Sequence, residues 1–296
     1  MKTPAISVVM PLHNAGAFLR NSTESILTQT FTDFEFIIIN DRSTDNSAEI
    51  LSSIKDPRIV RLENPYNTGH YIARNRGHAI ARGKYICAMD SDDLAHPQRL
   101  EEQFVFMEKN PEIGISGSNC RLMPKDIISQ LPLSYDKLKI GFITAPRVFF
   151  HPTLIMRRSL LDKFGLKYNE EYIFAGDGDF FMQGSKYFPI ANIASPLLTY
   201  FSHKNNITTR HSRTQIFLAK IIVGRYISSV LKIPVTGEEM QIHFNLMWGG
   251  IVDKEYIHMA YRWIDKIILA NKNQRFFNDS LLEEELRHLT STRFSL

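Results

Sequence analysis

The chain has only two cysteines among its 296 residues, and they leave no framework for disulfide pairing. Cys87 and Cys120 both lie in apolar, strand-like runs, so we expect free, buried thiols in a reducing compartment. No uncharged apolar stretch reaches about 18 residues, and the apolar run ending at Pro11 is too brief for a signal-peptide core. We therefore expect a cytoplasmic protein that does not span a membrane.

The chain also lacks a glycine-rich phosphate loop. No G-x-G-x-x-G or P-loop pattern follows any predicted strand. Such loops hold phosphate against a helix N-terminus. Any phosphate bound by this chain must then be held by a metal ion and by side chains.

Neither charge sign dominates, with 35 Lys plus Arg against 31 Asp plus Glu, and 44% of the residues are hydrophobic. That composition can fill a core and excludes global disorder. Residues 204–296 hold 13 basic and 9 acidic side chains and carry the whole excess. The excess can serve an anionic acceptor or a membrane surface, although a solvated helical face is the commoner explanation. We expect no nucleic-acid partner.

Apolar, β-branched runs alternate with helical patterns through the first 120 residues. Strands are predicted at residues 6–10, 36–39, 59–62, 85–89 and 113–116. Helices are predicted near residues 18–26, 50–54, 71–81 and 100–107. This alternation predicts an α/β fold whose mostly parallel sheet is flanked by helices.

From Thr209 onwards the sequence pattern predicts helices. One apolar stripe runs from Phe217 to Leu231 with Lys220 and Arg225 between its members, and another runs from Tyr256 to Ile268. A basic amphipathic helix can lie on a membrane surface. Docking onto the protein core is the default interpretation.

Three predicted strands end in polar groups. These ends are Leu12-His13-Asn14, Asn40-Asp41-Arg42-Ser43 and Asp90-Ser91-Asp92-Asp93. In open α/β sheets the ligand lies beyond the carboxyl ends of the strands, near the place where the strand order reverses. If these strands are neighbours, one crevice collects all of these groups.

The third of these ends carries three carboxylates within four residues. Asp90, Asp92 and Asp93 repel one another unless they share a proton or a divalent ion, and oxygen ligands suit Mg²⁺ or Mn²⁺. Asp93 can alternatively cap the helix predicted after Pro97. A cap explains one carboxylate but not three.

Five ordered motifs resemble those of the family 2 inverting glycosyltransferases. They are ISVVMPLHN, QTFTDFEFIIINDRSTDNS, NTGHYIARNRGHAIARGKYICAMDSDD, HPTLIMRRSLL and FAGDGDFF, between about residues 4 and 205. The resemblance implies the nucleotide-sugar-binding fold called GT-A over residues 1–205. Residues 1–120 would then form the nucleotide-binding half and residues 121–205 the acceptor-side half. Residues 206–296 would form a helical C-terminal extension that the resemblance does not cover.

The resemblance assigns a set of residues to the nucleotide-sugar donor: Pro11, His13, Asn14, Asp41, Arg74, Asp90, Ser91 and Asp92. Asp41 matches the acid that reads the base, and a carboxylate can accept the N3–H of uracil, which favours a UDP-sugar. A turn or cap residue is the alternative for Asp41. Arg74 matches a donor-contacting arginine, with a solvated helical arginine as the alternative.

Asp90 and Asp92 match the D-x-D motif of the family. The resemblance implies that Asp92 binds a Mn²⁺ or Mg²⁺ ion bridging the diphosphate, and that Asp90 contacts ribose or metal-bound water. His203 stands where some relatives carry a histidine near the metal, so we expect it as a further ligand; a loop histidine is the alternative.

An inverting transfer needs a base opposite the leaving group, and Asp177 falls where similar enzymes carry it. Asp179 is the competitor, with a cap for a helix starting near Phe180 as its alternative role. His151 and Arg157 belong to a segment that resembles the acceptor-side wall. For His151 we favour a buried, hydrogen-bonded structural role.

Three positions depart from the family pattern. His13 replaces a tyrosine and can still stack on a base, while Arg42 replaces a glycine and is expected to alter the turn after Asp41. Gly176 replaces the glutamate beside the base. This last change affects the acid/base arrangement rather than donor binding.

The resemblance therefore implies a metal-dependent, inverting glycosyltransferase for cell-surface polysaccharide synthesis. The expected partners are a UDP-sugar and a glycan or lipid-linked saccharide acceptor, with peripheral contact of the C-terminal helices at the inner face of the membrane. Two alternatives stay open. One is a sugar-phosphate nucleotidyltransferase, which needs a glycine-rich, basic loop where this chain has PLHNAG, and the other is a non-catalytic nucleotide-sugar sensor, suggested by Gly176.

Overall fold

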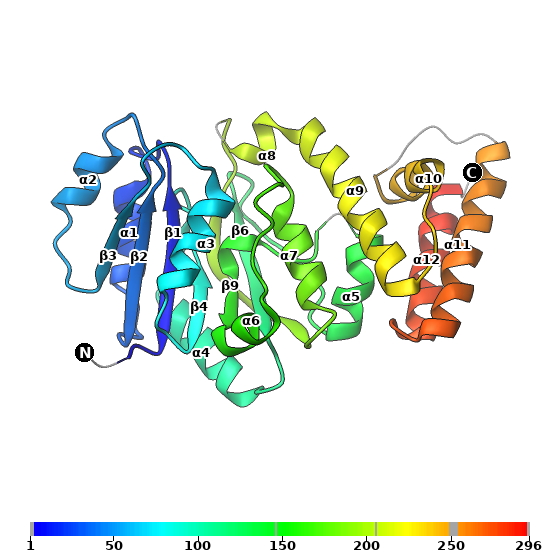
Figure 1. The fold of residues 1–296 in the computed structure, drawn as a ribbon, viewed down its shortest axis with the longest axis horizontal. Coiled ribbons are helices and arrows are strands. Elements are labelled where there is room, and N and C mark those ends of the chain that lie inside the picture. Colours follow the sequence, from blue (N-terminus) through cyan, green and yellow to red (C-terminus); the bar gives the residue numbers. More distant parts are fainter. Residues whose placement is uncertain (1–2, 146, 205, 249–253, 295–296) are drawn as a thin grey trace.

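The computed structural model describes residues 3–145, 147–204, 206–248 and 254–294. Within these residues, nine strands form one mixed sheet with helices on both faces (Figure 1). Eight strands follow the order β3-β2-β1-β4-β8-β6-β9-β5, and β7 pairs with β6. The strands are β1 (Ile6–Leu12), β2 (Phe34–Asn40), β3 (Ile59–Glu63), β4 (Tyr85–Ala88), β5 (Leu94–Ala95), β6 (Ile115–Met123), β7 (Ile127–Ile128), β8 (Ile155–Arg157) and β9 (Ile190–Phe201).

The first four strands pair in parallel, in the order β3-β2-β1-β4. The chain order therefore reverses between β1 and β4, which is where open α/β sheets bind ligands. Strand β8 is antiparallel to β4 and β6, and β5 is antiparallel to β9. The predicted α/β fold with a mostly parallel sheet is confirmed.

Alternate residues of the central strands enter two separate cores, because side chains in a strand point to opposite faces. Val9 and Ile37 pack with α3, α5, α6 and α7, whereas Val8 and Phe36 pack with α1, α2 and α4. The helices are α1 (Leu19–Leu27), α2 (Ser47–Ser53), α3 (His70–Ile80), α4 (Arg99–Lys109), α5 (Tyr135–Thr144), α6 (Arg158–Phe164) and α7 (Gly176–Gly184). The two layers hold β1, β2 and β4 rigidly between them.

The last third of the described chain is helical, as predicted (Figure 1). Helix α9 packs on α7 and α12 packs on α5, while Trp263 and Ile264 of α11 belong to the same core as one sheet face. Asn205, the last residue of the expected first domain, lies outside the described residues. The helices are α8 (Ile207–Arg210), α9 (Ser212–Leu231), α10 (Gly237–Trp248), α11 (Lys254–Gln274) and α12 (Asp279–Phe294).

Helix α9 is long and apolar enough, by length and composition, to cross a membrane, and 39% of its most apolar window is buried in the fold. The prediction of no membrane span considered only uncharged apolar stretches, and α9 is not one of them because Lys220 and Arg225 interrupt it. Ile222 and Leu231 are buried, whereas Phe217 is 61% exposed. The apolar stripe predicted for this helix is therefore packed only in its C-terminal part.

Both cysteines are free and buried, as predicted. Burial raises the pKa of the Cys87 thiol to about 12 and also raises the pKa of Cys120 far above its ordinary value. Neither residue can supply a thiolate nucleophile at neutral pH.

Candidate active site

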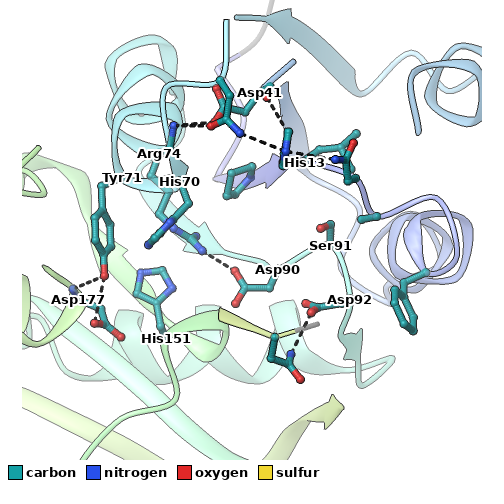
Figure 2. Close-up of a pocket in the computed structure, with 18 of the residues that line it drawn as sticks. His13, Asp41, His70, Tyr71, Arg74, Asp90, Ser91, Asp92, His151 and Asp177 are labelled. Atoms are coloured by element: carbon teal, nitrogen blue, oxygen red, sulfur yellow. Dashed lines mark hydrogen bonds and ion pairs between the residues drawn. The ribbon is translucent and has the colours of Figure 1, made fainter. Parts of the chain in front are cut away.

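One pocket of about 380 Å³ lies at the carboxyl ends of β1, β2 and β4 (Figure 2). It occupies the place where the strand order reverses. The structure brings all ten residues predicted for donor, metal and base to its walls. They are Pro11, His13, Asn14, Asp41, Arg74, Asp90, Ser91, Asp92, Asp177 and His203. Their individual roles stay predictions.

Asp41 follows β2 and is 2% exposed. Its Oδ1 accepts hydrogen bonds from the Asn64 amide at 2.6 Å and from the N–H and hydroxyl of Thr68, each at 2.8 Å. Its Oδ2 accepts the Gly69 N–H at 2.8 Å. Burial alone would raise the pKa of Asp41, but these hydrogen bonds outweigh it and hold the pKa below its ordinary value. The Asp41 carboxylate therefore stabilises the turn before α3, which agrees with the alternative prediction of a turn or cap residue. Its Oδ2 accepts one hydrogen bond and can accept another.

His13 lies at the rim of the pocket. Its Nδ1 is 2.9 Å from the backbone oxygen of Asp41, which can only accept, so Nδ1 carries the proton. The amide nitrogens of Asn67 and Asn14 lie 3.1 Å and 3.3 Å from Nε2, which accepts. The imidazole is therefore fixed in one tautomer while its ring stays exposed.

The turns after β1 and β2 contain strained residues. Asn14 and Arg42 adopt positive φ values of 51° and 58°, a conformation that costs non-glycine residues about 1 kcal/mol or more and clusters at functional sites. The Asn14 Oδ1 accepts the N–H groups of Thr44 at 2.7 Å and Asp45 at 3.3 Å, which ties the two turns together. Arg42 therefore adopts the left-handed conformation that glycine favours, and its effect on the turn stays a prediction.

Arg74 extends from α3 to form an ion pair with Asp90. Burial lowers the pKa of Arg74, but the Asp90 carboxylate raises it and prevails, so the cation persists. Its Nε and Nη1 groups are buried and have no hydrogen-bond partner among the described residues. The alternative of a solvated helical arginine is therefore wrong, and two buried nitrogens with three N–H donors are left for an acceptor.

Asp92 has two side-chain partners. Its Oδ2 lies 3.0 Å from Nε2 of His203 and 3.2 Å from the Asn206 amide nitrogen. The His203 ring also stacks on Phe18, with the centroids 4.8 Å apart. Burial and the neighbouring Asp90 carboxylate raise the pKa of Asp92. A cation at this point would relieve that repulsion.

The donor set fits a divalent cation. Carboxylate oxygens of Asp90, Asp92 and Asp93 lie within 4.8 Å of one another, and the His203 imidazole is beside Asp92. Carboxylates suit Mg²⁺ and Mn²⁺, and imidazole binds transition metals. Asp92 and His203, the two ligands predicted from the sequence, lie in contact here, and Asp90 is ion-paired with Arg74.

Asp93 is the buried member of this cluster, with 1% of its surface exposed. Its Oδ1 accepts the Phe201 N–H at 3.1 Å, which ties the acidic loop to β9. Burial and the charges of Asp90 and Asp92 raise its pKa well above the ordinary value. The interpretation as a helix cap is wrong, since α4 begins at Arg99.

Asp177 lies in the first turn of α7, which starts after Ala175 in the left-handed conformation, with φ of 61°. The Tyr71 hydroxyl accepts the backbone N–H of Asp177 at 3.1 Å and donates to its Oδ1 at 3.3 Å (Figure 2). A Cβ at position 176 would lie 2.8 Å from the Tyr71 ring. Gly176 therefore makes room for the tyrosine that orients Asp177.

The competing carboxylate, Asp179, does not line the pocket. It sits inside α7, where its Oδ1 accepts a hydrogen bond from the Gln183 amide at 3.1 Å. Because α7 begins at Gly176, the interpretation of Asp179 as a cap near Phe180 is wrong. Of these two carboxylates, Asp177 is the one that lines the pocket.

Two pocket histidines are held neutral. Burial and the Arg74 charge lower the pKa of His70 to about 4 and lower that of His151 well below its ordinary value. The Nε2 atom of His151 lies 2.7 Å from the Tyr168 hydroxyl, which agrees with the predicted buried, hydrogen-bonded structural role. The expectation for Arg157 is wrong, because it is bound to Tyr85 and to backbone oxygens at the end of α4, away from the pocket.

Sequence reasoning missed several residues of the pocket wall. Helical spacing marks Tyr71 as a core aromatic, and no pattern distinguishes a core aromatic from one that also presents a hydroxyl to a distant carboxylate. The Asn67-Thr68-Gly69 turn could have been found, since it lies inside a motif that the resemblance used. The missed lining residues include Phe18, Asn67, His70, Tyr71, Tyr200 and Asn206.

The chain is similar in sequence to known glycosyltransferases. The sequence model described as "Glycosyl transferase family 2" matches residues 7–165. An uncharacterised glycosyltransferase of Haemophilus influenzae is 31% identical over 232 residues, covering 74% of this chain and 72% of the relative. An uncharacterised glycosyltransferase of Methanocaldococcus jannaschii is 36% identical over 193 residues, and the alignment spans 62% of this chain and 65% of that relative's length.

Solved structures share the fold. TarS 1–349 from S. aureus, crystallised with UDP, superposes with a TM-score of 0.63 at 16% identity, covering 98% of this chain and 92% of the TarS chain. The mannosyltransferase PcManGT from Pyrobaculum calidifontis, in complex with GDP-Man and Mn²⁺, has a TM-score of 0.61 at 13% identity, covering 99% and 88%. These likenesses show the GT-A fold and, at such low identity, the fold alone.

Proposed function

Because the chain belongs to glycosyl transferase family 2, we propose that it transfers a sugar from a nucleoside diphosphate donor, with a UDP-sugar favoured, to a saccharide hydroxyl with inversion. The observation that carries the proposal is the convergence of Asp41, Asp92 and Asp177 on one pocket at the strand-order switch point. The UDP complex of TarS supports a uridine donor, while the GDP-Man complex of PcManGT makes the base the point to test.

On the donor side, Asp41 and His13 receive the base. Asp41 Oδ2 has one protein donor and stays anionic, so it can accept the N3–H of uracil. The exposed His13 ring offers a stacking face. The unpaired N–H groups of Arg74 point to a role on ribose or phosphate oxygens, where a charged donor is strongest.

Asp92 and His203 hold the cation in this proposal. When bound, Mn²⁺ or Mg²⁺ would offset the charge of the departing nucleoside diphosphate. The Mn²⁺ in the PcManGT complex supports this assignment. Asn206 donates a hydrogen bond to the Asp92 carboxylate, and Asp90 forms an ion pair with Arg74 beside it.

Asp177 acts as the general base. It accepts the proton of the acceptor hydroxyl as that oxygen bonds to the anomeric carbon and the bond from that carbon to the diphosphate breaks. In Figure 2, Asp177 comes from the opposite side of the pocket to Asp92, which suits attack opposite the leaving group. A single displacement of this kind inverts the anomeric centre, and Tyr71 keeps the carboxylate aimed.

The wider setting follows from the same proposal. We place the acceptor among the glycans or lipid-linked saccharides of cell-surface polysaccharide synthesis, and the protein in the cytoplasm with its C-terminal helices near the inner face of the membrane. Residues 1–205 would form the catalytic domain and residues 206–296 the helical extension.

A thermal-shift panel of UDP, GDP and dTDP, each with and without Mn²⁺, tests the proposal. We expect UDP with Mn²⁺ to raise Tm most. Stabilisation by GDP alone would replace the uridine assignment, and no stabilisation by any nucleotide would contradict donor binding. A UDP-sugar that binds but is never consumed, with any acceptor, would favour the sensor.

A further inference from the structure

A second, apolar groove of about 360 Å³ adjoins the donor pocket. Its walls come from α5 and the residues that follow it, and from α7, α9 and α10. Figure 1 shows where these helices lie in the fold. Among the described lining residues, four carry polar side chains: Arg147, Asp177, Ser212 and Gln215. The rest of the wall is aliphatic or aromatic, and includes Phe142, Phe181, Ile216, Phe244, Met247 and Trp248.

The groove and the donor pocket share two wall residues. Asp177 and Gln215 line both of them, so the proposed base lies where the two spaces adjoin. Gly178 also lines the groove, and a Cβ at that position would meet no atom within 4 Å. The groove wall beside Asp177 therefore has open space at Gly178.

The lining chemistry limits what can occupy this space. A bare glycan presents hydroxyls on every face and loses hydrogen bonds when it enters an apolar groove. An alkyl or isoprenoid chain gains free energy with each buried methylene. Arg147 is exposed and makes no ion pair with the described residues, so it suits an anionic group that links the chain to a sugar.

We propose that this groove holds the apolar carrier of the acceptor: the substrate is a saccharide joined through an anionic linker to a hydrocarbon chain, with its hydroxyl at Asp177. The inference rests on the proposed function and narrows its acceptor to the lipid-linked class. The apolar chain lies between α5, α9 and α10, and Arg147 faces the linker.

The test uses the full chain and two soluble probes, methyl and octyl β-glucoside, below the micelle concentration of the latter. Trp248 lines the groove, while the other tryptophan of the chain, Trp263, is buried outside its lining, so a change in fluorescence on titration reports occupancy through Trp248. We expect octyl glucoside to bind at least roughly tenfold more tightly than methyl glucoside, because its chain is buried. Equal affinities would overturn the proposal.

Neighbouring residues of α9 supply a matched pair of variants. Ile216 lines the groove and is 43% exposed, whereas Phe217 is 61% exposed and lines neither pocket. Ile216→Asp is expected to weaken octyl glucoside about tenfold or more, and Phe217→Asp to leave it unchanged. Equal weakening by both variants would mean non-specific adsorption to an apolar surface and would contradict a built groove.

A third variant fills the groove beside Asp177. Gly178→Leu adds a side chain whose Cβ would meet no atom within 4 Å, and it is expected to abolish octyl glucoside binding while Tm stays within a few degrees. Unchanged binding in this variant would place the chain outside the groove. For the linker, Arg147→Ala should weaken decyl phosphate but not octyl glucoside, measured with UDP and Mn²⁺ present; equal effects on both would remove the anionic linker from the proposal.

A parallel UDP titration separates the two failures. UDP binding with no preference for octyl glucoside would overturn the groove assignment and keep the glycosyltransferase proposal. Octyl glucoside binding without any nucleotide binding would overturn the donor site, and with it the assignment of the groove to an acceptor.

Discussion

The donor pocket and the apolar groove share Asp177 as a wall residue, but different structural elements line them. The pocket takes its charged groups from turns at the ends of β1, β2 and β4, which two cores hold in place. The groove takes its walls from helices and from the segment that follows α5, and two of the helices follow the last recognisable motif. If the proposed roles hold, the sheet positions the groups that bind the donor, while the C-terminal helices contribute to the groove proposed for the acceptor.

The largest expected effect separates binding from chemistry. Asp177→Asn removes the proposed base, so sugar transfer should fall by about 10²–10⁴-fold, measured as UDP release from the UDP-sugar that the thermal-shift panel and a donor screen select. Nucleotide affinity should not change, because the side chain keeps its shape. Asp92→Asn is the contrasting variant, since it should lose cation-dependent nucleotide binding. Equal loss of binding in both variants would refute this division of roles.

Tyr71→Phe tests whether the base needs its orienting partner. The variant removes the hydroxyl that contacts both the N–H and Oδ1 of Asp177, so kcat should fall about tenfold with the Kd for UDP unchanged. Tyr85→Phe is the matched control, because Tyr85 is also buried and hydrogen-bonded but lies away from the pocket. Equal kcat losses in both variants would reduce Tyr71 to a structural residue.

Glu35→Gln probes the sheet without touching either binding region. Glu35 accepts hydrogen bonds from the Ser7 hydroxyl at 2.6 Å and from the Arg82 backbone and guanidinium at 2.6–2.9 Å. We expect a loss of about 1–3 kcal/mol in the free energy of unfolding at pH 7 from chemical denaturation. The Kd for UDP should stay the same, and a changed Kd would mean that the pocket is not independently rigid.

The same variant should change the pH dependence of stability. Burial alone would raise the pKa of Glu35, but the hydrogen bonds from Ser7 and Arg82 hold it below its ordinary value of 4.5. A depressed folded-state pKa stabilises the native protein above that ordinary value, and this stabilisation is lost as pH falls through the folded pKa. Denaturation series between about pH 3 and 7 should therefore show a flatter acid limb for Glu35→Gln; parallel curves would contradict the assignment.

The smallest expected effect concerns the cysteines. Because burial raises the pKa values of both thiols, Ellman's reagent should label neither Cys87 nor Cys120 in the native protein and should label both after denaturation. Saturating UDP should leave this pattern unchanged. Rapid labelling of the native protein would show that the buried region around Cys87 and Cys120 opens to solvent.

Much of this architecture could be predicted from the sequence because the relevant signals are local. The apolar runs gave the strands, and Asp41 and Asp90 could be placed at one edge because parallel strands share their carboxyl ends. Contacts between distant segments could not be predicted. Tyr71 meets Asp177 across the fold, Arg74 is buried by its pairing with Asp90, and Arg157 turns away to hold α4.

Calorimetric titration of the wild-type chain with UDP, in the presence and absence of Mn²⁺, tests the central claim most directly. If Asp92 and His203 hold a cation that joins the diphosphate to the pocket, UDP should bind at least roughly tenfold more tightly with Mn²⁺, a difference of about 1.4 kcal/mol, and Asp92→Asn should erase the difference. Equal affinities with and without Mn²⁺, or no binding of UDP at all, would contradict the account.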